Sequence, residues 1–502
     1  MNFKNREPRS QVLRFKKEAP LGLACLSVLA AMALSACGGG SDNSATAEVV
    51  ATPHFYLAPV ELTAPTPTLG LAAIHTEAVL SGMETLPRAG LLPETIHAQL
   101  KALRAARRSA GQGEVVAAAA SAAAVTVFQP SQIRAAYGLP AVTGTAVPTT
   151  TAAQAALGAG QTIYLVDSND HPNALSDLNA FSRQFNMPGC TSLAITPATP
   201  LPLTTASPSA GCTFSVVYTD ATGKRTTTAP AYDSGWAFEI ALDVQEAHAI
   251  APLARIVLIE APSAGIAALS RAVSLANSMG SGIVSMSFGV AEGGWMTSFE
   301  NVFQGSNMQY FASTGDSGTG VNWPSVSAHV VAVGGTTLTL NGTSRTETVW
   351  SGTGGGTSKY VTVPAYQMAL SKTITFRRAA DVAMVADPST GQYIAFTPSG
   401  GTFGWYSAGG TSIASPAWAA MAAVINAKRL AGGLTMLPSF QNALYLDVLA
   451  VPTSYSSAFL DVTAGNDGSC ASCASTAGYD APTGLGTPNA TSLMAILSTV
   501  AQ

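Results

Sequence analysis

One serine stands in a glycine-rich turn directly before an apolar segment. The turn reads GGTS at residues 409–412, and residues 417–429 have the composition of a buried helix. Paired glycines permit a tight turn, and the N-terminus of a helix favours negative charge because its N–H groups are unpaired. Pro416 fits the first turn of such a helix. Ser412 is therefore a candidate nucleophile, although a serine that only caps a core helix would give the same pattern.

Two carboxyl groups stand four residues apart in a segment with strong helical periodicity, residues 236–248. Glu239 and Asp243 would share one face of the helix, close enough to share a proton. An exposed helix would rather place a cation at that offset, so the pair indicates catalysis or metal binding. A solvated helix face is the alternative. We expect Trp236 to line a cleft or pack in the core, and His248 to be structural.

A third candidate carboxyl, Asp316, follows a predicted buried strand in the string STGDSG. Loops at the carboxyl ends of strands are where open sheets place their sites. An aspartate before a serine and a glycine is also a common turn residue, which is the alternative for Asp316.

Strands and helices alternate along the chain around these candidates. Apolar runs predict strands at 162–167, 254–260, 282–287, 309–313 and 330–333, and helical periodicity predicts helices at 176–185 and 265–278. Strand, helix, strand at this spacing predicts an α/β fold with a mostly parallel sheet flanked by helices.

Composition narrows the class of protein. The chain has 502 residues, of which 47% are hydrophobic and 10% are charged, with a formal net charge of −4. The first 36 residues hold six basic and two acidic side chains, so this excess of four positive charges leaves −8 for the remainder. An acidic protein of this kind is not expected to bind nucleic acid.

The N-terminus predicts export. A basic stretch precedes an apolar run that ends in LSACG, so residues 1–36 are interpreted as a signal peptide. The ending resembles a bacterial lipobox, in which Cys37 would become a lipidated first residue and a membrane tether. A plain signal peptide is the alternative. Residues 37–126, rich in small residues, are interpreted as a tether and a short propeptide.

Four further cysteines agree with an oxidising compartment. We favour the pairs Cys190–Cys212 and Cys470–Cys473, because closure between cysteines near in sequence is the simplest solution. A zinc site is the alternative, and the single CxxC motif argues against it.

Four motifs in this chain resemble those of the sedolisins, the serine-carboxyl peptidases that share the subtilisin fold. They are ExxxD at Glu239 and Asp243, SxSxG at 285–289, STGDSG around Asp316 and GGTSxxSP around Ser412. The similarity continues through QIRAAYGLP at 132–140, VVAVGGTTL at 330–338, GTGGGTSKY at 352–360 and RRAADVA at 377–383. It implies a subtilisin-like peptidase domain over residues 127–502, with a C-terminal calcium-binding loop region.

The resemblance assigns a role to each candidate. Ser412 would be the nucleophile, Glu239 its general base, Asp243 the group that orients Glu239, and Asp316 the oxyanion donor. Carboxyl groups can fill these roles only when partly protonated, so an acidic optimum is expected. An ordinary subtilase with a histidine base is the rival, but none of the six histidines has the His-Gly-Thr setting it requires.

A cation site is implied near the C-terminus. By the resemblance, one calcium ion would be held by the side chains of Asp461 and Asp480 and by the carbonyls of Val462, Thr476 and Gly478. Hard oxygen ligands of this kind suit calcium. Glycine-rich turns without a metal are the alternative.

We therefore expect an acid-active serine endopeptidase that acts on proteins or peptides as a monomer, in the bacterial cell envelope or outside the cell. It would be made as a zymogen and cut within residues 114–126, whose composition is flexible. The alternative is a catalytically inactive sedolisin-like envelope protein that binds peptides.

Overall fold

A computed structural model describes residues 49–53, 60–66, 75–78, 124–342 and 344–501, which belong to one compact unit. The predicted signal peptide, Cys37 and most of the predicted propeptide lie outside these residues. No helix within the described ranges is long and apolar enough to cross a membrane.

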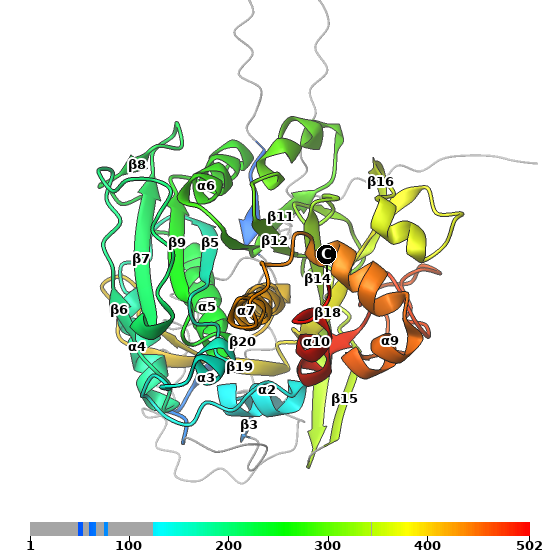
Figure 1. Ribbon diagram of the computed structural model, residues 1–502, viewed down its shortest axis with the longest axis horizontal. Helices are drawn as coiled ribbons and strands as arrows, with labels where there is room; N and C mark the ends of the chain where they lie inside the picture. The colour runs from blue at the N-terminus through cyan, green and yellow to red at the C-terminus, as the bar shows by residue number, and fades with distance from the viewer. Residues whose placement is uncertain (1–48, 54–59, 67–74, 79–123, 343, 502) are drawn as a thin grey trace, which may run out of the picture. The chain divides into compact units, whose positions relative to one another are not determined.

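A large, mostly parallel sheet forms the centre of this unit (Figure 1). Its seven parallel strands lie in the order β14-β12-β10-β5-β9-β7-β6, and β18 pairs parallel with β14. Antiparallel strands, β15 and β8, lie beside β14 and β7. The strands are β5 (Thr162–Ser168), β6 (Cys190–Ser192), β7 (Cys212–Thr219), β8 (Arg225–Thr226), β9 (Arg255–Ala261), β10 (Gly282–Met286), β12 (Met308–Ser313), β14 (Val330–Asn341), β15 (Ser344–Val349) and β18 (Val382–Val385). The predicted mostly parallel sheet is confirmed.

A second sheet of five strands lies in the order β2-β20-β19-β4-β3. Its strands are β2 (Val60–Leu62), β3 (His75–Ala78), β4 (Ala124–Phe128), β19 (Thr390–Phe396) and β20 (Gly404–Ala408). Strand β4 pairs with both β3 and β19, so the last three residues of the predicted cleavage range belong to a paired strand.

Two helices lie against the central sheet and carry the candidate residues. They are α5 (Ser234–Ile250) and α7 (Thr411–Ala431), and apolar residues of both pack with strands β5, β9 and β10 in one core. On its other side α5 packs Phe238 against Phe396 and Tyr406 of the second sheet. Every residue of α5 is buried as a result, including the carboxyl groups of Glu239 and Asp243.

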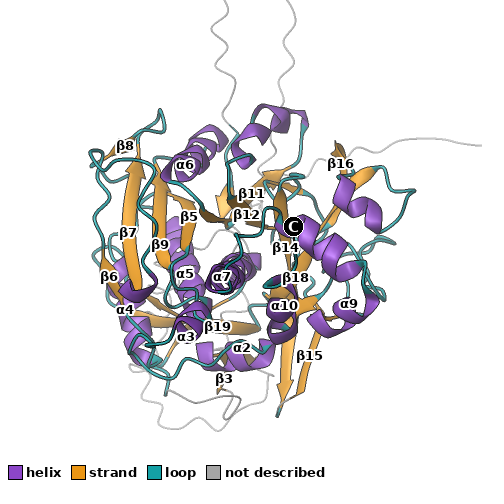
Figure 2. Ribbon diagram, viewed as in Figure 1, coloured by secondary structure: helices purple, strands orange, loops and turns teal. Residues whose placement is uncertain are grey.

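The remaining elements complete the layers around these sheets (Figure 2). Helix α6 (Ile266–Met279) packs on the opposite face of the central sheet from α5. The other helices are α2 (Pro130–Tyr137), α3 (Thr151–Ala155), α4 (Ala174–Gln184), α8 (Phe440–Asn442), a π-helical segment (Ala443–Leu449), α9 (Pro452–Ala458) and α10 (Ala490–Leu497). Short 3₁₀ turns span Pro208–Ala210, Gly294–Ser298, Glu300–Phe303 and Ala365–Ala369. The other strands are β1 (Thr52–Pro53), β11 (Phe288–Ala291), β13 (Asn322–Trp323), β16 (Gly356–Thr362), β17 (Phe376–Ala379), β21 (Phe459–Leu460) and β22 (Thr487–Pro488).

Predicted and observed bounds differ at one place that matters. Helix α7 begins at Thr411, not after Pro416, so Ser412 and Pro416 both lie inside the helix. The prediction that Pro416 occupies the first turn is wrong. A proline is tolerated there because the carbonyl of Ser412, four residues earlier, has another polar neighbour, the Ser287 hydroxyl at 3.3 Å.

Candidate active site

The candidate catalytic residues meet at the carboxyl edge of the central sheet. The loops that follow β10 and β12 reach the first turn of α7 there, since Ser287 donates to the carbonyl of Ser412 and Asp316 accepts from the N–H of Thr411. This is the edge at which parallel sheets place their sites.

Ser412 is the second residue of α7 and is fully buried. Gly410 stands at the N-cap with a φ of 114°, a conformation that favours glycine, and Ser412 therefore does not cap the helix. Its hydroxyl lies 3.5 Å from the carbonyl of Ser287. The capping alternative is excluded, and the serine lies where the helix dipole stabilises an anion.

Glu239 faces Ser412 from α5 and is fully buried. Burial raises the pKa of Glu239 well above its ordinary value, the Ser412 hydroxyl opposes that rise, and the charges of Asp167 and Asp316 add to it. Neither carboxyl oxygen has a hydrogen bond of ordinary geometry. The solvated-helix alternative is therefore wrong, and Glu239 is free to exchange a proton with its neighbours.

Asp243 lies one turn further along α5 and is also fully buried. Ser287 donates a hydrogen bond of 2.7 Å to Asp243 Oδ1, while Oδ2 has no partner. Burial raises the pKa of Asp243 well above its ordinary value, with further contributions from the charges of Asp167 and Glu239. Ser287 thus links Asp243 to the backbone of Ser412, a contact that sequence reasoning missed.

Asp316 reaches the same site from the loop after β12. Its Oδ1 accepts hydrogen bonds from the backbone N–H (2.8 Å) and the hydroxyl (2.6 Å) of Thr411, the residue before the serine. Its Oδ2 is buried and has no partner. Burial raises the pKa of Asp316 to about 7. The carboxyl is therefore protonated in acid and has one oxygen available to donate a hydrogen bond.

A further carboxyl, Asp167, belongs to the same cluster. It lies near the end of β5, is fully buried, and neither of its oxygens has a partner. Its charge acts on both Glu239 and Asp243, and burial raises its pKa to about 7. The sequence signal was available, since an acidic residue ending an apolar strand is unusual, but it was interpreted only as a strand end.

Trp236 and His248 lie near opposite ends of α5, and both side chains are buried. Trp236 is 6% exposed and lies 6.4 Å, between ring centroids, from Phe288. His248 lies at the other end of α5, its Nε2 donates to the carbonyl oxygen of Pro188 (2.8 Å), and its Nδ1 lies 3.4 Å from Cys190 Sγ. The structural interpretation of His248 is supported, and histidine is not the partner of Ser412 in the geometry described.

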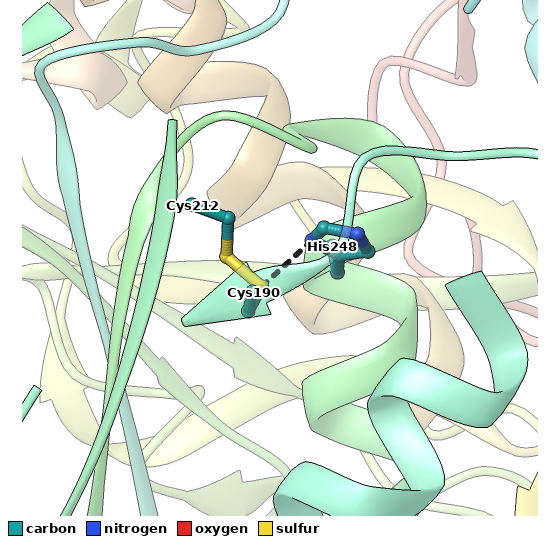
Figure 3. Close-up of side chains that lie close together, drawn as sticks. All are labelled: Cys190, Cys212 and His248. Carbon is teal, nitrogen blue, oxygen red and sulfur yellow. Dashed lines mark hydrogen bonds between the residues drawn. A yellow bond between two sulfur atoms is a disulfide. The ribbon is translucent and has the colours of Figure 1, made fainter. Parts of the chain in front are cut away.

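Both predicted disulfides are present, Cys190–Cys212 and Cys470–Cys473. Figure 3 shows the first one beside His248, a trio whose ligand atoms are close enough for one metal ion. Because the two sulfur atoms are bonded to each other, neither is a thiolate ligand. The structure therefore supports a disulfide here and not a zinc site.

The predicted calcium ligands lie together in the C-terminal loops. Asp461 Oδ2 accepts from the N–H of Gly478 at 2.8 Å, and Asp480 Oδ2 accepts from the N–H of Thr476 at 3.2 Å. Burial raises the pKa of Asp480 to about 6, and the charge of Asp461 adds to the rise. Val462 is buried beside them. A buried carboxyl and a half-buried one that repel each other fit a cation between them.

A short N-terminal strand, β1, pairs with β11, the strand that directly follows Ser287. Thr52 and Pro53 form β1, which pairs antiparallel with Gly289 and Phe288 of β11. The N–H of Ala51 donates to the carbonyl of Ala264 at 2.8 Å. Residues 51–53 therefore occupy a strand edge adjoining Ser287, at the margin of the catalytic cluster.

Three known proteins match part of this chain in sequence. The chain is 30% identical over 222 residues to kumamolisin of Bacillus sp. (strain MN-32), 35% over 188 residues to xanthomonalisin of Xanthomonas sp. (strain T-22), and 33% over 192 residues to sedolisin of Pseudomonas sp. (strain 101). These matches cover 38%, 33% and 35% of this chain. The chain spans 39%, 21% and 30% of the length of these relatives, and no family model matches it.

The fold matches a solved structure over most of its length. The structure is Pseudomonas sedolisin, a serine-carboxyl proteinase complexed with two molecules of pseudo-iodotyrostatin, with a TM-score of 0.56 and 22% identity. The match covers 74% of this chain and 98% of that one. Over the matched segments the chain is therefore similar in sequence to kumamolisin, xanthomonalisin and sedolisin, and its fold is similar to that of Pseudomonas sedolisin.

Proposed function

We propose that this chain is an acid-active serine endopeptidase that hydrolyses peptide bonds in proteins or peptides. One observation carries the proposal: Ser412 lies beside Glu239 of the Glu239–Asp243 carboxyl pair, and Asp316, whose Oδ2 has no partner among the described residues, is bonded to Thr411, the residue before Ser412. A nucleophile, a base and an oxyanion donor are the three groups that acyl transfer needs. A family with this chemistry matches the chain in sequence.

The first half of the reaction uses Glu239 as the base. Its carboxylate takes the proton of Ser412 Oγ as that oxygen bonds to the substrate carbonyl carbon. Negative charge develops on the carbonyl oxygen, and protonated Asp316 donates a hydrogen bond to it from Oδ2. Glu239 then gives its proton to the leaving amine, and the carbon–nitrogen bond breaks.

The second half repeats these steps with water. Glu239 takes a proton from water, the water oxygen attacks the acyl carbon, and Ser412 leaves with its proton restored. Asp243 shares a proton with Glu239 and keeps it oriented, and Ser287 holds Asp243 in place. Because Asp316 must stay protonated, activity is expected to fall as the pH rises through about 7.

Hydrolysis of a denatured protein from pH 3 to pH 8 tests this function. Wild type is compared with Ser412→Ala and Glu239→Gln, each checked for folding by circular dichroism. We expect activity confined to acid and a loss of about 10⁴-fold or more in both variants, since removing a nucleophile or base removes most of the catalytic advantage. Folded, processed wild type that cleaves nothing at any pH would favour the inactive peptide-binding alternative.

We further propose that residues 37–126 act as a propeptide and make the protein a zymogen. Strand β1 supports this, because its pairing with β11 occupies an edge beside Ser287 where an extended peptide could bind. Since β4 is paired on both sides, we place the cut before residue 124, within the remaining predicted range. N-terminal sequencing of the mature protein checks this position, and a mature start upstream of residue 114 would contradict it.

Export and membrane attachment are proposals from the N-terminal sequence. Residues 1–36 would be a signal peptide and Cys37 a lipidated anchor, which puts the protein in the cell envelope or outside the cell. Mass spectrometry of the isolated N-terminal peptide would detect the acyl chains. A monomer is expected, and sedimentation of the mature protein checks it.

One calcium ion is proposed as a structural cofactor. The side chains of Asp461 and Asp480 and the carbonyls of Val462, Thr476 and Gly478 would hold it. The buried carboxyl of Asp480 and the half-buried carboxyl of Asp461 support this assignment, because a cation would offset their mutual repulsion. When bound, the ion would tie the C-terminal loops together and would take no part in proton transfer.

A further inference from the structure

A second group of acidic side chains continues the catalytic cluster across the sheet. Asp167 of β5 stands opposite Glu260 of β9, and Glu260 stands opposite Tyr218 of β7. Strand side chains two residues apart share a face. Asp167 and Glu260 follow Leu165 and Leu258 by two positions, and those leucines pack in the core that includes α5. The acidic row therefore lies on the same face of the sheet as Glu239 and Asp243.

Glu260 is the most deeply placed member of this row outside the catalytic cluster. It is fully buried, and its Oε1 accepts a hydrogen bond of 3.2 Å from the N–H of His171. Its Oε2 and Oδ1 of Asp170 both lack a donor, although the two carboxyls lie close enough to bond through a proton. Two acceptors that face each other are satisfied only when one of them carries a proton.

The surroundings of Glu260 favour its protonated form. The titratable groups that face it are Asp167 from β5, Asp170 from the loop after β5 and Tyr218 from β7, whose hydroxyl bonds Asp170. His171 contributes its N–H, and its ring pairs with Asp177 of α4. Among the described residues that shift the pKa of Glu260, none is a lysine or an arginine. Burial first, and then the charge of Asp170, raise that pKa well above its ordinary value.

We propose that Glu260 and Asp170 hold one proton between them, and that its loss at high pH places a second negative charge beside Asp167 and disables the catalytic carboxyls. The row of acids then limits the folded, competent state to acidic surroundings. In acid Glu260 keeps its proton, and the cluster tolerates the pair. The expected loss of catalysis at high pH rests on the proposed peptidase function. The shared proton between Glu260 and Asp170 does not, because it affects the stability of the fold alone.

Urea unfolding measured at each pH from 4 to 9 tests whether Glu260 and Asp170 share a proton in the folded state. Glu260→Gln imitates protonated Glu260, because its amide can donate to Asp170 and cannot ionise. A group whose pKa is higher in the folded state makes stability fall as pH rises above its unfolded value. We therefore expect the stability curve of the variant to match wild type near pH 4 and to decline at a pH at least half a unit higher. Asp170→Asn should shift the pH dependence of stability in the same direction. This second variant tests the proposal if Glu260→Gln does not fold.

The control is Glu347→Gln, which changes another buried glutamate whose oxygens accept hydrogen bonds from Tyr137 and Thr336. This variant should lose stability at every pH without moving the alkaline decline upward. Curves of Glu260→Gln and Asp170→Asn that decline at the wild-type pH would overturn the proposal. If Glu260→Gln cleaves substrate at pH 4 at a rate within about twofold of wild type, Glu260 takes no part in the chemical steps. If wild type cleaves nothing, the proposed peptidase function is wrong, but the unfolding result remains valid.

Discussion

Two buried acidic regions of this molecule differ in how their charge is compensated. Asp381 is fully buried and accepts hydrogen bonds at both oxygens, from Arg377 (2.9 and 2.6 Å), Tyr445 (2.7 Å) and the N–H of Ala332 (2.8 Å). The cluster around Glu239 and Asp243 is equally buried, but among the residues that the structure describes several of its oxygens have no hydrogen-bond partner, and no lysine or arginine shifts the pKa of either carboxyl. Burial alone therefore does not distinguish a structural carboxyl from a reactive one.

The difference shows what each region can do. A buried carboxylate with a matched guanidinium is held in one geometry and one charge state. Carboxyls without a cation compete for protons, so their protonation changes with pH and with each neighbour. The first arrangement fixes the fold, and the second could supply the proton that the proposed acyl transfer needs.

Removing the cation from the first region should have the largest effect. Arg377→Met leaves Asp381 buried without charge compensation, and we expect the free energy of unfolding to fall by about 3–5 kcal/mol. Urea unfolding at pH 5 measures it. The neighbouring Arg378→Met is the control, since this side chain is only half-buried, and it should cost less than about 1 kcal/mol. Equal losses in the two variants would break the comparison.

Removing an unpartnered oxygen from the second region should affect catalysis more than folding. Asp316→Ala deletes the proposed oxyanion donor, and we expect kcat to fall about 10²–10³-fold, or about 2.7–4 kcal/mol in the activation barrier, with little change in KM. Steady-state kinetics at pH 4 measures it. Asp387→Ala, which removes a carboxyl bonded to Thr337, is the control and should leave kcat unchanged. A similar drop in the control would show a general structural defect.

Neutralising a member of the cluster should stabilise the protein, but only away from acid. The pKa of Asp167 is about 7 when folded and ordinarily 3.8, so the folded state holds a proton that the unfolded state has lost between these values. Stability therefore falls as pH rises through this window. Asp167→Asn avoids the loss, and we expect a gain of about 1–3 kcal/mol at pH 7. Thermal unfolding at pH 3.5 and pH 7 checks it, and an equal gain at both would contradict the explanation.

A bound cation would compensate the third acidic group, formed by Asp461 and Asp480, and its loss should have the smallest effect. At ten times the dissociation constant, calcium stabilises the folded state by about 1.4 kcal/mol. Thermal unfolding with calcium and with a chelator measures this difference. Asp461→Asn should abolish the response to calcium, and a response that survives the substitution would place the ion elsewhere.

The sequence predicted the elements that carry the candidate site residues where the signal is local. The types and spacing of Glu239 and Asp243 within one helix, the turn before Ser412, and the loop position of Asp316 all depend on a few neighbouring residues. The alternation of strands and helices likewise predicted the mostly parallel sheet. Local patterns survive folding because backbone geometry, turn chemistry and hydrophobic periodicity act over one or two turns of chain.

Only the tertiary structure decided how these residues are surrounded. Sequence left α5 open as a solvated helix, and the packing of a second sheet on Phe238 makes it buried on every side. The bond from Ser287 to Asp243 spans 44 residues, and the bond from Thr411 to Asp316 spans 95. Asp167 joins the cluster only through its strand order and register.

The amino-acid sequence by itself therefore determined which chemical groups are present and which local elements carry them. The tertiary structure decided which carboxyl oxygens are buried away from water and which of them accept hydrogen bonds. The physical reason is that desolvation and charge compensation are sums over neighbours distant in sequence, and these set the protonation of a carboxyl.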